Sequence, residues 1–89
     1  MDFCGNLRRH GREVGVYFVE HEYDPGLCGN KVDVWIEVNG QKVHLPYRIT
    51  RRHLPGGKAP WKSESDGAMC NSLLFCVDNV LPADLTYYL

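Results

Sequence analysis

The sequence predicts a small α+β domain: a three-stranded antiparallel β-meander with one C-terminal helix packed on its apolar face. Three observations support this prediction: an Asn-Gly turn between two alternating stretches, a further alternating stretch before them, and helical spacing of apolar residues near the C-terminus. A chain of 89 residues is long enough for a single compact domain with a modest core. Its 44% hydrophobic and 24% charged residues are typical of globular proteins and argue against disorder.

The N-terminal part of the chain is expected to supply the first strand of the meander. Residues 1–12 contain two glycines and little periodicity, so we expect an N-terminal arm there. Residues 13–20 alternate valines with other residues and predict a strand. Residues 21–30 contain turn signals such as Asp24-Pro25-Gly26 and are expected to form a connector. The first strand can then lie antiparallel to residues 32–38.

Residues 32–50 are expected to form a β-hairpin around Asn39-Gly40, because a type I′ turn needs positive φ at both central residues. A two-residue loop there sets pairs on a core face and on an opposite face: Ile36–Val43, Val34–Leu45 and Val32–Tyr47 on the first, Trp35–His44 and Glu37–Lys42 on the second. A one-residue slip would mix the two faces, so the pattern fixes the register. Pro46 falls at a non-hydrogen-bonded position, which predicts an edge strand over residues 42–50.

The C-terminal third is expected to hold a loop and a helix. Residues 51–65 contain Pro55-Gly56-Gly57 and several basic side chains, so they predict a basic Pro/Gly loop. Residues 67–81 predict a helix that ends before Pro82, because apolar side chains recur at helical spacing. A buried strand is the alternative for the apolar run within this segment. On a helix, Phe75 would be an exposed aromatic side chain.

The formal net charge is −1, but the charges are segregated along the sequence. Residues 13–37 carry six acidic side chains and one lysine, whereas residues 38–63 carry six basic side chains and no acid. A basic stretch of this kind can steer an acidic partner toward the protein. The other interpretation is a solvated loop that nearby acids neutralise.

Four cysteines and four histidines are the residues that could carry metal or nucleophilic chemistry. Neither Cys-x-x-Cys nor His-x3-His spacing occurs, so we expect no metal site and no cofactor, and zinc binding is a lesser alternative. No nucleophile motif surrounds a cysteine or histidine, so we expect no enzyme, and a small Cys/His enzyme is likewise the weaker alternative. No signal-peptide segment and no apolar run near the roughly 18 residues of a membrane span occur. These features predict a cytoplasmic protein with reduced thiols and no membrane contact, against the alternative of two disulfides in a secreted domain.

Two kinds of binding surface can be predicted from the aromatic and charged residues. The leading hypothesis is a small protein-binding regulator or inhibitor. Its apolar anchors would be Tyr17, Trp35 and His44, and its steering charges would be Arg51, Arg52, Lys58 and Lys62. The alternative is an RNA- or single-strand-binding module that uses the basic stretch 48–62, where Trp61 offers a ring for stacking.

Neither hypothesis rests on a residue-level motif of a known family. A small chain with segregated charge and no catalytic motif is typical of regulators and inhibitors, including those carried by phages and mobile elements. A homodimer is compatible with the same features. The competing structural interpretation is that the C-terminal tail, with Tyr87 and Tyr88, covers the Trp35 face within the domain.

Overall fold

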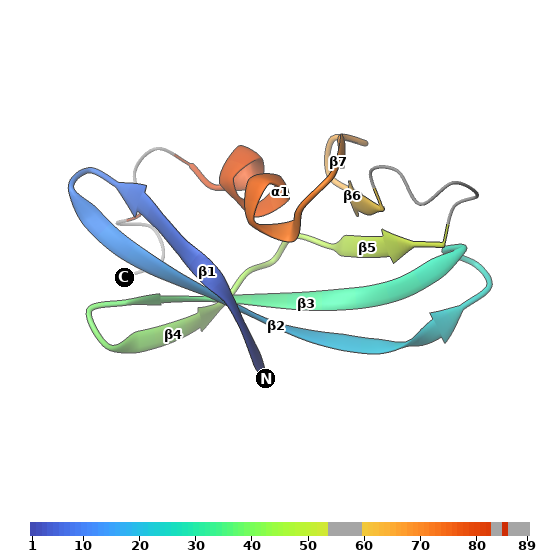
Figure 1. Ribbon diagram of the computed structural model, residues 1–89, viewed down its shortest axis with the longest axis horizontal. Helices are drawn as coiled ribbons and strands as arrows, with labels where there is room; N and C mark the ends of the chain where they lie inside the picture. Colours follow the sequence, from blue (N-terminus) through green and yellow to red (C-terminus); the bar gives the residue numbers. More distant parts are fainter. Residues whose placement is uncertain (54–59, 83–84, 86–89) are drawn as a thin grey trace.

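The computed structural model describes residues 1–53, 60–82 and 85. Within them, seven strands form one antiparallel sheet, which curls into a half-barrel and is accompanied by one short helix. The elements are β1 (Asp2–Arg9), β2 (Arg12–Asp24), β3 (Gly29–Val38), β4 (Gln41–His44), β5 (Ile49–Arg52), β6 (Trp61–Ser63), β7 (Met69–Cys70) and α1 (Leu73–Val80). The strand order is β1-β2-β3-β5-β6-β7, and β4 pairs with β3 outside this path. Figure 1 shows the two ends of the sheet rising on the side where α1 lies.

The prediction of a three-stranded meander is therefore wrong, and the N-terminal arm is its first error. Residues 2–9 form β1, which pairs with β2 through a two-residue turn at His10 and Gly11. Both turn residues have positive φ, 50° and 72°, as a type I′ hairpin requires. Histidine is one of the non-glycine residues that tolerate this conformation.

The Asn39-Gly40 hairpin and its register are confirmed, but only over its first four pairs. Ile36 lies opposite Val43 and Trp35 opposite His44, and the turn residues have φ of 54° and 77°. The backbone N–H of Leu45 still donates to the Val34 carbonyl, at 2.9 Å. Beyond that point the chain departs from β3.

Residues 42–50 are consequently not one edge strand. The strand is interrupted around Pro46. Pairing with β3 resumes at Ile49, which lies opposite Val32, the position predicted for Tyr47. Proline cannot donate to a ladder, and the extra residues form an irregular link between β4 and β5. One edge of β3 therefore holds two successive strands, of which β5 lies inside the sheet because β6 covers its other side.

The predicted loop 51–65 and helix 67–81 also contain strands that the sequence did not indicate. Trp61–Ser63 pairs with β5, and Met69–Cys70 pairs with β6. The helix starts only at Leu73, where the Ser72 hydroxyl caps it by accepting from the Phe75 N–H at 3.1 Å. It ends at Val80, before Pro82, and leaves Phe75 58% exposed, as expected for a helix.

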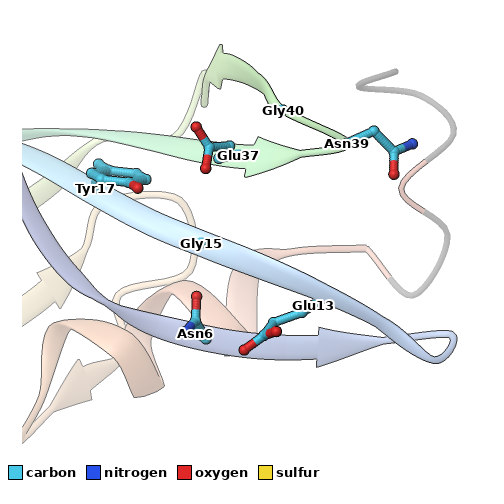
Figure 2. A pocket seen from close by; sticks show the side chains of 7 residues that line it. All are labelled: Asn6, Glu13, Gly15, Tyr17, Glu37, Asn39 and Gly40. Atoms are coloured by element: carbon cyan, nitrogen blue, oxygen red, sulfur yellow. The ribbon is translucent and has the colours of Figure 1, made fainter.

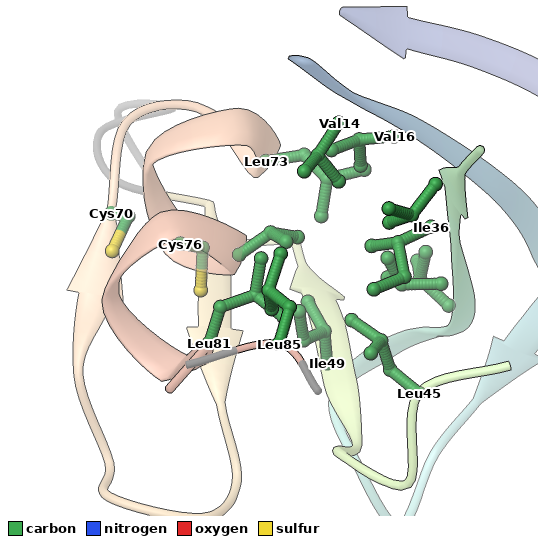
Figure 3. Close-up of a cluster of buried hydrophobic side chains, with 14 residues drawn as sticks. Val14, Val16, Ile36, Leu45, Ile49, Cys70, Leu73, Cys76, Leu81 and Leu85 are labelled. Atoms are coloured by element: carbon green, nitrogen blue, oxygen red, sulfur yellow. The ribbon is translucent and has the colours of Figure 1, made fainter. Parts of the chain in front are cut away.

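The core lies between the concave side of the sheet and α1 (Figure 3). Apolar side chains of β2 and β3 point toward the helix, which contributes Leu73, Cys76 and Val77. Leu85, close to the C-terminus, is also buried in this cluster. Tyr87 and Tyr88, which the tail hypothesis requires, lie outside the described residues.

Candidate functional site

The candidate site is the outer face of the sheet, the side of β1–β4 that points away from α1. Alternation along β3 buries Val34 and Ile36 against the core and directs Asp33, Trp35 and Glu37 to the other side. Cross-strand partners share a face, so the partners of these residues on β2 and β4 belong to the outer face too. Tyr17, Trp35 and His44 are thus brought together, as the sequence predicted.

Four rings form a row across this face, one from each of four neighbouring strands. Phe3 pairs with Tyr17, Tyr17 with Trp35, and Trp35 with His44. The ring centroids are 5.2 Å apart for Phe3 and Tyr17 and 4.8 Å apart for Trp35 and His44. We call Phe3, Tyr17, Trp35 and His44 the aromatic row. Sequence reasoning missed Phe3, which is 55% exposed, because residues 1–12 were expected to be an arm.

The Asp33 carboxylate lies next to the His44 end of the aromatic row and contacts two histidines, His21 and His44. His21 Nε2 lies 2.6 Å from one Asp33 carboxylate oxygen, and His44 Nε2 lies 3.5 Å from the other. The hydrogen bond with His21 is the largest influence on Asp33 and lowers the pKa of its carboxyl group below the ordinary 3.8. His44 is therefore fixed from two sides, by the indole of Trp35 and by this carboxylate.

Lys42 and Glu37 occupy the next row toward the hairpin turn. The Lys42 ammonium lies 4.6 Å from the centre of the Tyr17 ring and 3.5 Å from a Glu37 carboxylate oxygen. The opposite-charge pair that the register predicted is present. A cation over the ring face is a favourable arrangement, since the π face carries negative charge.

A hollow of about 230 Å³ lies beside this pair, in the row where β2 carries a glycine (Figure 2). Gly15 faces Asn6 on β1 and Glu37 on β3, so there is no side chain at the centre of that row. The hollow, which we call the Gly15 hollow, is lined by Asn6, Glu13, Gly15, Tyr17, Glu37, Asn39 and Gly40. Sequence reasoning missed this hollow, because its walls come from three separate segments, namely β1, β2, and β3 with the turn that follows it.

The basic residues predicted to accompany Trp35 are not gathered around it. Arg51 and Arg52 belong to β5 instead of a loop, and register places Arg51 opposite Asn30 and Trp61, on the face opposite to Trp35. Arg51 lies 5.3 Å from the Trp61 ring centre and 3.2 Å from a Glu20 carboxylate oxygen. Its charge is thus already matched within the domain.

Two further residues of the predicted basic surface, Trp61 and Lys62, contact other side chains of the domain. Trp61 packs edge-on against Phe18, with centroids 6.4 Å apart. Lys62 Nζ lies 3.8 Å from a Glu64 carboxylate oxygen. Arg52 is half-buried, and its Nε has no hydrogen-bond partner within the described part of the chain. Lys58 lies outside the described residues.

Within residues 1–53, 60–82 and 85, no group of three or more His, Cys, Asp or Glu side chains could hold a metal ion. In the same ranges, no helix has both the length and the apolar character that a bilayer crossing requires. All four cysteines are free thiols.

Comparison with known proteins found no matching family model, no matching curated protein and no matching solved structure. Function is therefore inferred from the geometry of the chain's own residues. The outer face offers a half-exposed aromatic row with carboxylates, amides and the basic side chains of Arg8, Lys31 and Lys42 at its margin. Such a surface can bind by apolar contact in the centre and by polar contact at the rim.

Proposed function

We propose that this protein is a small non-enzymatic regulator or inhibitor that binds a protein partner through the outer face of its sheet. The observation that carries the proposal is the aromatic row, which places four rings side by side on a face opposite to the core. Aromatic side chains supply much of the binding energy in protein interfaces because they bury large apolar areas. We propose further that the protein acts in the cytoplasm, which its four free thiols support.

The side chains around the row favour a protein partner over nucleic acid. Single-strand binding combines stacking rings with cations that contact the phosphates. Here Asp33, Glu37 and Glu13 lie on the same face as the rings, and the basic side chains beside them are matched to these acids. Lys42 pairs with Glu37, Arg8 is the cross-strand partner of Glu13, and Lys31 is near enough to Asp33 to help lower the pKa of its carboxyl group. Carboxylates in these positions repel a phosphate backbone, so a nucleic-acid partner has the weaker support.

Pull-down from a lysate of the source cells tests this proposal when three proteins are compared. The wild-type chain should recover the same partner with and without nuclease. Trp35→Ala should lose it, since truncating a buried anchor costs about 2 kcal/mol or more, or roughly thirtyfold in affinity. Phe75→Ala is the control, because Phe75 is an exposed ring located on α1, away from the outer face.

Three results would contradict the proposal. Undiminished recovery by a folded Trp35→Ala variant would remove the outer face as the docking surface. Recovery that disappears on nuclease treatment would favour the nucleic-acid alternative. A dimer in sedimentation experiments that Trp35→Ala converts to monomer would identify a second copy of the chain as the occupant of this face.

A further inference from the structure

We propose that the Gly15 hollow receives an arginine or lysine side chain of the protein partner, next to the aromatic row. The identity of the partner as a protein rests on the function proposed above. The preference of the hollow for a cation rests on its own walls and can be measured without the partner.

The first argument is the shape of the hollow. A Cβ atom added at Gly15 would lie 3.3 Å from a Tyr17 ring carbon, 3.6 Å from the Asn6 amide oxygen and 3.6 Å from the Glu37 Cβ. Side chains from three strands therefore surround the space that the glycine leaves open. Its volume of about 230 Å³ corresponds to several water molecules at roughly 30 Å³ each, which is enough for the end of a long side chain.

The second argument is the chemistry of the walls. Glu13 and Glu37 contribute carboxylates, Asn6 contributes an amide oxygen, and no cationic side chain is among the seven lining residues. Glu13 lies opposite Arg8 in the sheet but makes no ion pair within the described part of the chain, and Lys42 lies 3.5 Å from one Glu37 oxygen. A positive group entering here gains two carboxylate interactions, whereas an anion is repelled.

The third argument is that a cationic side chain of the protein itself, Lys42, already lies at the margin of this hollow. Lys42 places its ammonium over the Tyr17 ring and beside Glu37, and both residues also line the hollow. The same ring and carboxylate can therefore contact a cation from the other side. Arginine fits better than lysine, because its planar group offers five donors to the carboxylate and amide oxygens and can stack on the ring.

The test uses the whole ¹⁵N-labelled chain and an uncharged-backbone probe, N-acetyl-arginine methylamide, followed by NMR. We expect millimolar binding, with shift changes centred on the amides of Gly15, Tyr17 and Gly40, and no such changes with the glutamate analogue. Glu13→Gln should weaken binding by about two- to fivefold, the usual effect of one exposed ion pair. Gly15→Val should abolish binding by filling the hollow without changing charge.

Glu22→Gln is the matched control, since Glu22 is an exposed acid of the same strand that does not line the hollow. It should bind the probe as the wild-type chain does. Equal weakening by Glu22→Gln and Glu13→Gln would reduce the effect to net charge and overturn the proposal. So would the absence of shifts around Gly15, or full binding by a folded Gly15→Val variant.

The two proposals fail separately. Loss of partner recovery in Trp35→Ala together with no probe binding at the hollow would leave the docking surface and overturn the cation pocket. Probe binding at the hollow together with full recovery by Trp35→Ala would leave the cation pocket and overturn the proposed docking surface. When both hold, Glu13→Gln should also weaken the natural complex by about two- to fivefold.

Discussion

Trp35 and His44 lie directly opposite each other on β3 and β4, with their ring centroids 4.8 Å apart, and His44 also faces the Asp33 carboxylate. A cross-strand pair of this kind stabilises the hairpin at the edge of the sheet as well as forming part of the proposed docking surface. The two functions can be separated, because stability is measured on the free protein and recognition on the complex.

Truncating both rings should therefore be less costly than the sum of the single truncations. We expect a coupling free energy of about 0.5–1.5 kcal/mol between Trp35→Ala and His44→Ala, measured by urea unfolding of the two single variants and the double variant. Pairing Trp35→Ala with Phe75→Ala, on α1, should give additive losses. A coupling indistinguishable from that of the control pair would mean that the two rings do not contact each other in solution.

The Trp35–His44 pair could be predicted because all its determinants are local. Asn39-Gly40 selects the turn, the turn fixes the register, and alternation assigns the faces. Pairing between distant segments has no comparable signal in one sequence. Trp61–Ser63 and Met69–Cys70 are too short to show a period. The first becomes a strand because β5 offers it an unpaired edge, and the second because β6 then offers the next edge.

The aromatic row illustrates the same limit within the candidate site. Tyr17, Trp35 and His44 could be assigned to one face from the hairpin and the preceding strand. Phe3 joins them only through the His10-Gly11 turn, which is a less frequent type I′ sequence than Asn-Gly. The basic residues were misassigned because charge along the chain does not show which face of the sheet a side chain occupies. Arg51 lies on the other face of the sheet from Trp35.

The low pKa of Asp33 predicts a specific dependence of stability on pH. When the folded pKa is below the unfolded one, a carboxyl group contributes stability above the unfolded pKa of 3.8 and loses it as the pH falls through the folded pKa. The free energy of unfolding should therefore decrease below pH 3.8 more steeply in the wild-type chain than in Asp33→Asn. Carboxyl NMR should show Asp33 titrating below 3.8.

His21 supplies the largest part of that shift, so it provides the control for the assignment. His21→Ala should move the Asp33 titration back toward 3.8, because the hydrogen bond at 2.6 Å is lost. His44→Ala should have the smaller effect, since the His44 contact is longer, at 3.5 Å. A larger effect of His44→Ala than of His21→Ala would show that the second histidine dominates.

The four thiols should react in an order set by their burial. Cys28 is exposed, whereas Cys70 and Cys76 are buried between β7 and α1. Burial, reinforced by the neighbouring Cys70 thiol, raises the pKa of Cys76 to about 12, and burial also raises the pKa of Cys4. At pH 8 a thiol reagent should modify Cys28 first and Cys76 only on unfolding, as followed by mass spectrometry.

Denaturation without reductant should then release all four thiols. A count of two or zero would show disulfides and overturn the proposed cytoplasmic location. One zinc ion per chain in elemental analysis would overturn the expectation that the protein binds no metal. Cys28→Ser should abolish only the first, rapid thiol modification. That result would assign the rapid modification to the turn between β2 and β3.

Two glycines on neighbouring strands should respond in opposite ways to the same substitution. Gly29 and Gly15 both lie in strands, but their surroundings differ. A Cβ at Gly29 would lie 2.2 Å from the Arg51 carbonyl oxygen and 2.8 Å from the Arg52 Cα, both backbone atoms of β5. A Cβ at Gly15 meets only side-chain atoms, the nearest being a Tyr17 ring carbon at 3.3 Å.

Gly29→Ala should therefore force β3 and β5 apart, because a backbone neighbour cannot rotate away as a side chain can. We expect a loss of about 2 kcal/mol or more in the free energy of unfolding, at the upper end of the cost of overpacking. Gly15→Ala should be neutral or stabilising by up to about 1 kcal/mol, since alanine loses less entropy than glycine in a strand. Urea unfolding of both variants measures the difference. Equal stability of the two would mean that β5 does not approach β3 at Gly29, and the order β3-β5-β6 in the sheet would have to be abandoned.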